Sequence, residues 1–465
     1  MRFSTNPARV LTLLALSMLS GCASLIQHEP EPESAFVLIG EQGAPLARAI
    51  TSQPSCPSFS VDGQARAMAV RVPLQAIPQR PGAKLQNPPS AAVLTCEAAV
   101  PGGAREVRVA GRALPLPTAE PRRIVVIGDT GCRIKNGEIQ DCNDEQAFPF
   151  ARIAASAAAF RPDLVIHVGD FHYREEPCPE DRPGCKGSPW GYGWDAWNAD
   201  FFSPAKPLLQ AAPWLVARGN HETCARAGQG WWRYLDPHAI KPNGMCDDPK
   251  DDAIGDYTDP YAVPIGPDAQ IIVFDTANTW YKGFKEGDPR RAIYADTMRK
   301  VGALARQARY NIGLDHHPLF AFGATIDKKT KAISLFGADK GLIEAFGEVE
   351  PDYLPSNISM LLSGHVHLWE QTSFARRFPT QFVVGFSGTD EDIVPLPESV
   401  GPTETPAPGA IVEHMSSWIN GFGFMTMERI GPEDWLVKVR DRDGKERNTC
   451  RVHGKKSSCE IAQVK

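Results

Sequence analysis

The chain has 465 residues, of which 42% are hydrophobic, and a formal net charge of −6 at pH 7. This length and apolar content allow a large catalytic domain and a smaller one, each with a buried core. The acidic balance, without a cluster of Lys and Arg, argues against a nucleic-acid-binding surface, so no nucleic acid is expected as a partner. An anionic substrate would then need a local source of positive charge, such as bound metal ions.

Residues 1–21 predict a signal peptide. A positively charged start precedes an apolar run, Val10 to Leu19, that is too short to span a bilayer. The following Leu19-Ser20-Gly21-Cys22 resembles the lipobox of bacterial lipoproteins, in which Cys22 becomes the lipidated first residue of the mature chain. No Asp follows Cys22, so the resemblance implies an exported protein with a lipid anchor in the outer membrane of a Gram-negative bacterium, on its periplasmic or surface face. An ordinary secretory peptide is the alternative.

The eleven cysteines agree with export. Ten remain when Cys22 is set aside, and they fall as near neighbours along the chain. This spacing favours five local disulfides, namely Cys56–Cys96, Cys132–Cys142, Cys178–Cys185, Cys224–Cys246 and Cys450–Cys459. Free buried thiols are the alternative. No CxxC pair is present, so a structural zinc knuckle is not expected.

The segment before the first apolar strands divides into two parts. Residues 22–34 predict a polar tether, because Glu and Pro dominate it and leave nothing apolar to bury. Residues 35–118 contain short β-type segments, at 67–72, 91–96 and 105–109, separated by Pro and Gly turns. They predict a small all-β domain of the sandwich type.

Residues 121–445 predict an α/β catalytic domain. Continuous apolar runs at Arg123–Ile127 and Leu164–Val168 are typical of buried parallel strands, and a helix expected at 148–160 makes them a βαβ unit. Further elements are a helix at 294–308 and strands at 214–217, 270–274, 310–314, 358–362, 381–385, 422–428 and 435–441. A proline-rich stretch at 391–414 predicts a spacer or a rim loop, and residues 446–465 a disulfide-linked tail.

Five of the predicted strands are followed by polar clusters. These are Gly128-Asp129-Thr130-Gly131, Gly169-Asp170-Phe171-His172-Tyr173, Gly219-Asn220-His221-Glu222, Asp315-His316-His317-Pro318 and Ser363-Gly364-His365-Val366-His367. In open α/β sheets, ligands bind outside the carboxyl ends of the strands, so the five clusters are expected to converge. Together they supply carboxylate, amide, imidazole and phenol, a set suited to iron, manganese or zinc.

The ordered set GD, GDxxY, GNHE, HxP and GHxH resembles the calcineurin-like metallophosphoesterase superfamily, over about residues 124–431. The resemblance implies an α/β fold in which a β-sandwich is flanked by helices, a four-layer αββα arrangement, here preceded by the small all-β domain. Two details resemble the purple acid phosphatase branch. Gly131 stands where many members have a histidine, and Tyr173, three residues after Asp170, fits the position of a metal-binding tyrosine.

The resemblance implies two metal ions. The first would be held by Asp129, Asp170, Tyr173 and His367, and the second by Asp170, Asn220, His316 and His365. A tyrosinate with carboxylates is a hard, anionic set, so the first ion is expected to be Fe(III) and the second a divalent Fe, Zn or Mn. The implied reaction is hydrolysis of a phosphate ester, in which a metal-bound hydroxide attacks phosphorus in line.

The remaining site residues leave alternatives open. His221 resembles the histidine of the GNHE motif, which orients the substrate or protonates the leaving oxygen, and Glu222 is expected to fix its tautomer. His317 is an alternative ligand to His316 or a weak candidate for substrate contact. His172 either faces the substrate or packs, and Tyr173 could be an ordinary core tyrosine. The aromatic residues Trp190, Tyr192, Trp194, Trp197, Trp231 and Trp232 either pack or line a cleft.

The predicted function is that of an acid phosphatase-like enzyme acting on a small-molecule phosphate ester. The alternatives are a phosphodiesterase of the same superfamily and a catalytically silent binding protein anchored at the surface. Loss of catalysis usually removes ligands, and here every ligand position of the tyrosine branch is filled, which favours an enzyme. A membrane is the other expected partner, through Cys22. Nothing in the sequence indicates an oligomeric state.

Overall fold

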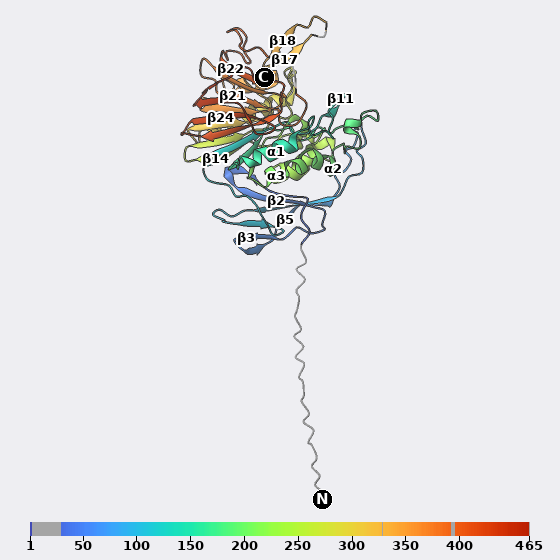
Figure 1. Ribbon diagram of the computed structural model, residues 1–465. Helices are drawn as coiled ribbons and strands as arrows, with labels where there is room; N and C mark the ends of the chain where they lie inside the picture. Colours follow the sequence, from blue (N-terminus) through green and yellow to red (C-terminus); the bar gives the residue numbers. More distant parts are fainter. Residues whose placement is uncertain (2–28, 328, 392–395, 465) are drawn as a thin grey trace. The chain divides into compact units, whose positions relative to one another are not determined.

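The computed structural model describes residues 1, 29–327, 329–391 and 396–464 (Figure 1). The predicted signal peptide beyond Met1, the predicted lipidation site Cys22 and the tether up to His28 lie outside the described residues. Glu31–Lys465 form one compact unit. Among the described helices, none combines the length and the apolar character needed to cross a membrane.

The larger of the two main sheets of the described residues has eleven strands. Their order is β26 (Lys456–Cys459), β25 (Glu446–His453), β24 (Asp434–Asp441), β23 (Gly423–Arg429), β9 (Arg123–Ile127), β12 (Leu164–His167), β13 (Trp214–Val216), β1 (Ser34–Ile39), β2 (Pro45–Thr51), β6 (Val93–Ala99) and β5 (Ala69–Gln75). The central strands β9, β12 and β13 are parallel, so their carboxyl ends meet at one edge of the sheet.

The second main sheet of the described chain has seven strands. Their order is β14 (Tyr261–Gly266), β15 (Ala269–Val273), β16 (Tyr310–Leu314), β19 (Ile358–Ser363), β21 (Thr380–Val384), β20 (Trp369–Phe374) and β22 (Val412–Trp418). Strands β15, β16, β19 and β21 are parallel, and their carboxyl ends also meet at one edge. The strands predicted at 270–274, 310–314, 358–362 and 381–385 are therefore confirmed in this sheet, as the continuous apolar runs are in the larger one.

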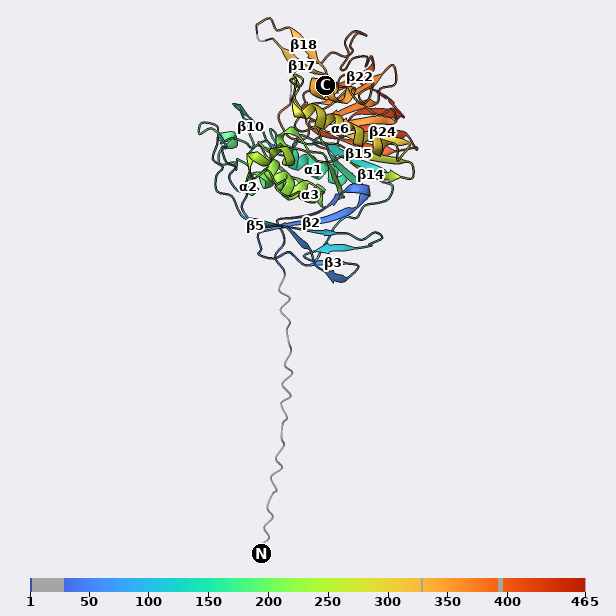
Figure 2. The same cartoon turned by 180° about the vertical axis from the view of Figure 1, so that it is seen from behind.

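Helices cover the outer faces of the two sheets (Figures 1 and 2). Because successive side chains of a strand point to opposite faces, Ile124 and Val126 of β9 enter the core between the sheets, whereas Val125 and Ile127 pack under helices. Those helices are α1 (Phe150–Ala159) and α3 (Ser203–Leu209), while α6 (Pro289–Ala305) and α7 (Lys340–Gly347) cover the smaller sheet. The four-layer αββα fold predicted from the sequence is thus confirmed.

Shorter helices, two hairpins and a small sheet lie outside the two main sheets and their covering helices. The helical ones are η1 (Glu41–Gly43), η2 (Pro183–Cys185), α2 (Trp194–Trp197), η3 (Asn198–Phe202), η4 (Asn220–Glu222), α4 (Gly228–Gly230), η5 (Trp231–Leu235), η6 (Pro249–Asp251) and α5 (Asp252–Gly255). Two hairpins are β10 (Ile134–Lys135) with β11 (Glu138–Ile139), and β17 (Gly323–Ile326) with β18 (Ile333–Phe336). A small sheet has the order β4 (Gln64–Arg66), β3 (Phe59–Val61), β7 (Val107–Val109) and β8 (Arg112–Ala113).

The N-terminal region is all-β, as predicted, and it is joined to the large sheet. Strand β1 pairs in parallel with β13 at Leu38 and Trp214, and β2, β6 and β5 continue the sheet outward from there. The C-terminal residues predicted as a tail likewise form strands, β25 and β26, at the opposite edge. Both chain ends therefore complete one sheet, a pairing that local apolar patterns do not reveal.

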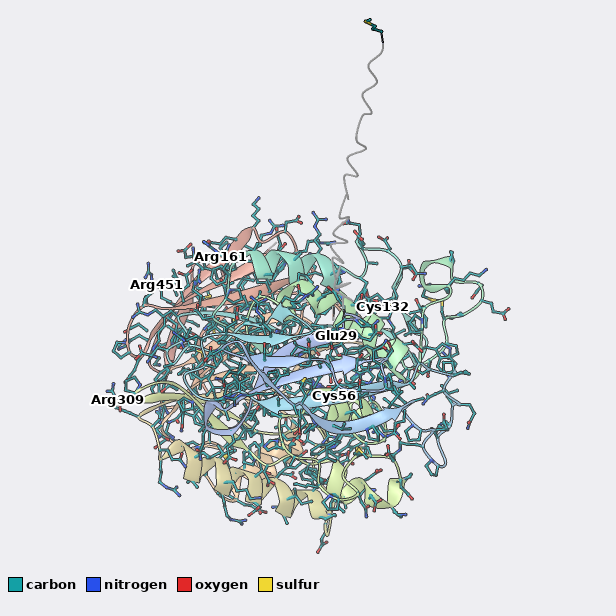
Figure 3. The ribbon with its side chains drawn as sticks, turned by 90° about the horizontal axis from the view of Figure 1, so that it is seen from below. Glu29, Cys56, Cys132, Arg161, Arg309 and Arg451 are labelled. Carbon is teal, nitrogen blue, oxygen red and sulfur yellow. A yellow bond between two sulfur atoms is a disulfide. The ribbon has the colours of Figure 1, made fainter. Side chains whose placement is uncertain are left out.

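All five predicted disulfides are present. They join Cys56 to Cys96, Cys132 to Cys142, Cys178 to Cys185, Cys224 to Cys246 and Cys450 to Cys459. Cys56 and Cys132, one member of each of the first two pairs, are labelled in Figure 3. The Cys132–Cys142 bond closes the segment that carries the β10–β11 hairpin, immediately after the Asp129 cluster.

A candidate dinuclear metal centre

The predicted ligands come from the carboxyl ends of parallel strands in both sheets. Asp129 follows β9 and Asp170 follows β12, while Asn220, His316 and the His365–His367 pair follow β13, β16 and β19. Since the two sheets face each other, these ends lie around one point. Contacts connect all seven predicted ligands, which are Asp129, Asp170, Tyr173, Asn220, His316, His365 and His367.

One half of this cluster surrounds the buried phenol of Tyr173. Its Oη lies 3.0 Å from Asp129 Oδ1, 2.8 Å from Asp170 Oδ2 and 2.9 Å from His367 Nε2. A phenol has one proton, so it cannot donate to both carboxylates at once, and the surplus of oxygen lone pairs fits a cation. Burial, followed by the charges of the two aspartates, raises the pKa of Tyr173 well above its ordinary value. Without a strongly charged ion the phenol therefore stays protonated.

The other half surrounds the side-chain oxygen of Asn220. Its Oδ1 lies 3.1 Å from His316 Nε2 and 2.9 Å from His365 Nδ1. His316 Nδ1 donates to the Val168 carbonyl at 2.9 Å, which turns Nε2 toward the oxygen atoms of Asn220 and Asp170. Burial lowers the pKa of His316, but the Asp170 carboxylate outweighs it and raises that pKa to about 10. A proton thus occupies the place that a metal ion would fill.

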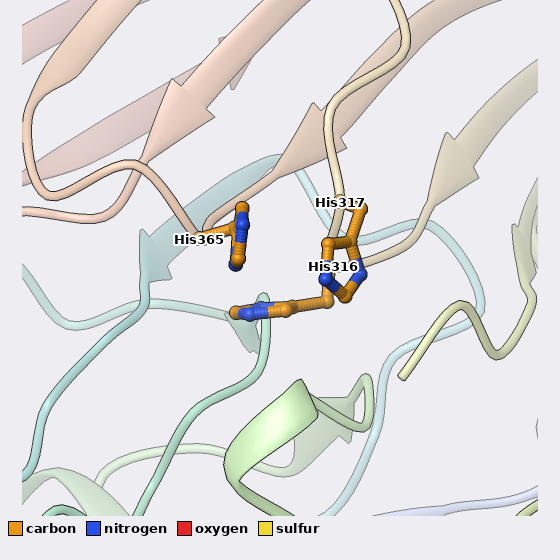
Figure 4. Close-up of side chains that lie close together, drawn as sticks. All are labelled: His316, His317 and His365. Atoms are coloured by element: carbon orange, nitrogen blue, oxygen red, sulfur yellow. The ribbon is translucent and has the colours of Figure 1, made fainter. Parts of the chain in front are cut away.

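Asp170 belongs to both halves. Its Oδ2 lies 2.8 Å from the Tyr173 phenol and 3.1 Å from His316 Nε2, and its Oδ1 accepts the His221 backbone N–H at 2.8 Å. Two groups with ligand atoms within 4.8 Å of one another meet here, Asp129 with Asp170 and His316, and His316 with His317 and His365. Figure 4 shows the three imidazoles of the second group side by side. The donor set fits two cations that share one carboxylate.

Comparison of the chain with known protein families agrees with this geometry. Residues 122–368 match the family model described as calcineurin-like phosphoesterase. The chain belongs to the calcineurin-like phosphoesterases. Membership makes it a phosphoester hydrolase by class and implies a dinuclear metal centre, which confirms the superfamily predicted from the motifs.

Two solved structures are similar to this phosphoesterase in fold. The purple acid phosphatase PPD1 from yellow lupin (Lupinus luteus) seeds has 14% identity and a TM-score of 0.50, with 92% of this chain and 74% of that chain covered. PhoD has 11% identity and a TM-score of 0.50, with 91% of each chain covered. At such identities the likeness concerns the fold alone. No curated protein matches the chain.

The phosphoesterase holds three of the predicted ligand residues in an uncommon backbone conformation. Asp129, Asp170 and His365 have positive φ values of 52°, 59° and 72°. Such values are rare for residues other than glycine, and at functional sites the surrounding structure maintains them. Here the Asp129 N–H donates to the Gly169 carbonyl at 3.0 Å, and the His365 N–H donates to Asp129 Oδ2 at 3.1 Å.

Glu222 has a different role from the one predicted. We expected it to fix the tautomer of His221, but its carboxylate instead accepts four backbone N–H groups, those of Asp170, Phe171, His172 and Gly219. Glu222 therefore holds the loop that carries Asp170 and does not contact the His221 ring. His221 and Glu222 are adjacent in sequence, but in the one-turn η4 helix their side chains point in different directions.

Gly131 and Asp200 shape the space after Asp129 so that no histidine fits there. A Cβ atom on Gly131 would lie 2.7 Å from the Tyr173 backbone nitrogen and 2.9 Å from the Phe171 carbonyl oxygen, so no side chain fits. The buried Asp200 carboxylate accepts the N–H groups of Cys132 at 3.0 Å and Tyr173 at 2.7 Å. The Tyr173 loop thus fills the space next to the first motif.

His221 lies beside the cluster, within a group of charged residues that sequence reasoning missed. Its Nδ1 lies 2.9 Å from the His172 carbonyl and 2.7 Å from Glu175 Oε1, and its Nε2 lies 2.9 Å from Lys135 Nζ. Burial and then Arg226 lower the pKa of His221 well below its ordinary value, so the ring is neutral. Nδ1 then donates to the His172 carbonyl, and Nε2 is the acceptor that faces two cations, Lys135 Nζ and, at 2.7 Å, Arg226 Nη2.

The two weaker candidates for substrate contact have different surroundings. His317 lies in the cluster, with Nδ1 3.2 Å from Thr276 Oγ1 and its ring centroid 4.2 Å from that of His365. It therefore stays an alternative ligand. The buried His172 ring packs against Tyr192 and Trp197, with centroids 5.6 and 5.4 Å away. Trp194, Trp197, Trp231 and Trp232 are buried as well, which agrees with packing.

Proposed function

We propose that this phosphoesterase hydrolyses phosphate esters with two metal ions. Asp129, Asp170, Tyr173 and His367 would hold the first ion, and Asp170, Asn220, His316 and His365 the second. The observation that carries the proposal is the position of Asp170, whose single carboxylate serves a phenol-containing half and an imidazole-containing half. When bound, two such ions lower the pKa of a water molecule and neutralise phosphate charge in an in-line displacement.

The donor chemistry supports a different ion in each half. Asp129, Asp170 and a deprotonated Tyr173 would bring three negative charges, which suits Fe(III). Asn220 and two imidazoles are neutral, which suits divalent Fe, Zn or Mn. Because burial, and then the charges of Asp129 and Asp170, raise the pKa of Tyr173, only an ion of high charge would displace the phenolic proton.

The chain's own residues would position the ester around these ions. His221 stands 3.9 Å from Asp170 through its Nε2 and is held by the His172 carbonyl and Glu175, so its ring has a fixed orientation at the edge of the cluster. We assign two alternative roles to the His221 ring. It orients the substrate, or it protonates the leaving oxygen. Phosphate monoesters are the first choice of substrate, and diesters are the alternative.

The decisive experiment is a visible spectrum of iron-loaded protein. A Tyr173 phenolate bound to Fe(III) donates electron density to the metal and gives a broad visible absorption, which Tyr173→Phe should remove at matched iron content. Tyr294→Phe is the control, because Tyr294 is also fully buried but belongs to α6 and packs in the cluster that covers the outer face of the smaller sheet. Its colour should be unchanged.

A colourless wild-type protein with full iron occupancy would show that Tyr173 is not a ligand. The same preparations should be assayed on p-nitrophenyl phosphate and on bis(p-nitrophenyl) phosphate. Hydrolysis of neither ester by protein with two bound ions would favour the catalytically silent binding protein.

A further inference from the structure

The β10–β11 hairpin holds one lysine, Lys135, at a fixed position beside the predicted metal ligands. Its turn is Asn136-Gly137, with φ values of 49° and 78°, the pattern of a tight two-residue hairpin. Lys135 ends the first strand and pairs with Glu138. The Cys132–Cys142 disulfide closes the loop around it, so the hairpin has little freedom to move away.

The hairpin is also fixed to the segment that carries Tyr173. The Ile134 N–H donates to the Tyr173 carbonyl at 3.1 Å, and the Glu175 N–H donates to the Ile134 carbonyl at 3.1 Å. At its base, Gln140 accepts the Arg133 N–H at 2.8 Å and donates to the Gly388 carbonyl at 2.8 Å. The backbone therefore sets the distance between Lys135 and the cluster.

Lys135 is a half-buried cation without a carboxylate partner in the described part of the chain. Its Nζ lies 2.9 Å from His221 Nε2 and 5.5 Å from the centroid of the Tyr173 ring. No ion pair of the described residues includes it, whereas the neighbouring Arg226 is paired with Glu175. Buried charges in proteins are normally paired with an opposite charge. The described chain supplies no such partner for this ammonium, which leaves room for an anion from outside.

The donors of Lys135 are only partly used. A lysine ammonium has three N–H donors, and His221 Nε2, which Arg226 Nη2 also approaches at 2.7 Å, accepts at most one of them. The other two remain beside the cluster that would hold the phosphorus centre. Burial, and then the positive charge of Arg226, lowers the pKa of Lys135, and the negative charges of Glu175 and Asp170 oppose this only in part.

We propose that Lys135 binds a non-bridging oxygen of the substrate phosphate, next to His221. The proposal rests on the phosphate-ester function proposed above and adds a residue that lies outside all five motifs. A fixed ammonium contributes one unit of charge, which a dianionic monoester uses more fully than a monoanionic diester. Lys135 should therefore strengthen binding of monoesters and inorganic phosphate more than binding of diesters.

The test compares metal-loaded wild type, Lys135→Met and Lys135→Arg. Calorimetric titration with inorganic phosphate should show about 10- to 100-fold weaker binding by Lys135→Met, the cost of losing a hydrogen bond to a charged group. Its kcat/KM for p-nitrophenyl phosphate should fall by a similar factor, and that for bis(p-nitrophenyl) phosphate by less than about 5-fold. Lys135→Arg, which keeps the charge, should recover part of both losses.

The control is Lys438→Met, which removes a lysine of β24 that pairs with Glu446. It should match the wild type in phosphate affinity and rate. Wild-type phosphate affinity in Lys135→Met would overturn the proposal, and so would a loss of bound metal or of visible colour, because Lys135 would then act on the ligands. If the wild type hydrolyses neither ester, the proposed function fails, while phosphate affinity still decides the role of Lys135.

Discussion

The two halves of the metal centre share Asp170 but differ in charge and in support. The Tyr173 half is built from carboxylates, a phenol and the His367 imidazole, is almost fully buried and is held by Asp200 and by the β10–β11 hairpin. The Asn220 half is built from an amide and imidazoles, and His365 and Asn220 are partly exposed. The halves stand at the ends of similar parallel strands, so the charge of the donors, and not their place in the fold, distinguishes the ions that they favour.

The difference in support has a consequence for tolerance to change. In the Tyr173 half, a bulky side chain cannot replace Gly131 and the hairpin backbone is tied to Tyr173 itself. In the Asn220 half, the second histidine of the His316-His317 pair lies close enough to offer another nitrogen. A single substitution in the Tyr173 half should therefore disturb all of its ligands together. A single substitution in the Asn220 half should remove one ligand and leave the others in place.

Removing the shared carboxylate should have the largest effect, because both halves depend on it. We expect Asp170→Asn to lose most of both ions and to reduce kcat at least ~10³-fold. Metal content by mass spectrometry and the rate on p-nitrophenyl phosphate check this. His221→Ala is the control, since it should retain both ions and lose mainly turnover. Full metal content with a normal rate in Asp170→Asn would exclude a shared site.

Removing one imidazole should empty one half of the metal centre and leave the other half occupied. We expect His316→Ala to lose the ion of the Asn220 half, with kcat reduced about 100-fold, while the visible colour of the Tyr173 half remains. The measurement is the metal-to-protein ratio together with the visible spectrum. His317→Ala is the matched variant and should keep two ions. The opposite pattern, with metal lost from His317→Ala alone, would make His317 the ligand.

The smallest of the three effects is steric and concerns the Tyr173 half. Gly131→Ala puts a methyl group against the Tyr173 backbone, so we expect a loss of about 1–3 kcal/mol in the free energy of unfolding and a weaker visible band. Denaturant unfolding measures the first and the spectrum of iron-loaded protein the second. Gly102→Ala is the control, because no atom lies within 4 Å of its added Cβ. Equal stability of the two variants would contradict the tight contact.

Local patterns in the sequence predicted the strands that carry the site and the residues that lie in it. The run at Arg123–Ile127 is apolar from Ile124 onward because β9 is covered on both faces there, and the structure gives the strand the same bounds. The contacts that depend on pairing between distant segments could not be predicted. The junction of β1 with β13 and the approach of Lys135 to His221 both follow from register and turn geometry, which apolar periodicity does not specify.

The motifs also gave the wrong neighbour for His221. Glu222 is next in sequence, but Glu175, from the loop after Tyr173, contacts the ring. Only the folded loop brings Glu175 there. The pair Asn136-Gly137 between Cys132 and Cys142 is a local signal that could have indicated a fixed hairpin, and so the position of Lys135. The signal peptide and lipidation of Cys22 stay predictions.

The order of strands in the large sheet also constrains the time at which the enzyme becomes complete. Strand β9, which ends at Asp129, lies between β12 and β23, and β23 comes from near the end of the chain. A nascent chain can pair β9 with β12 early, but one edge of β9 stays open until residues 423–429 have been made. Contacts between such distant segments close slowly, and an unpaired strand edge invites association with other chains. Synthesis must therefore be almost finished before the loop that bears Asp129 rests on a closed sheet.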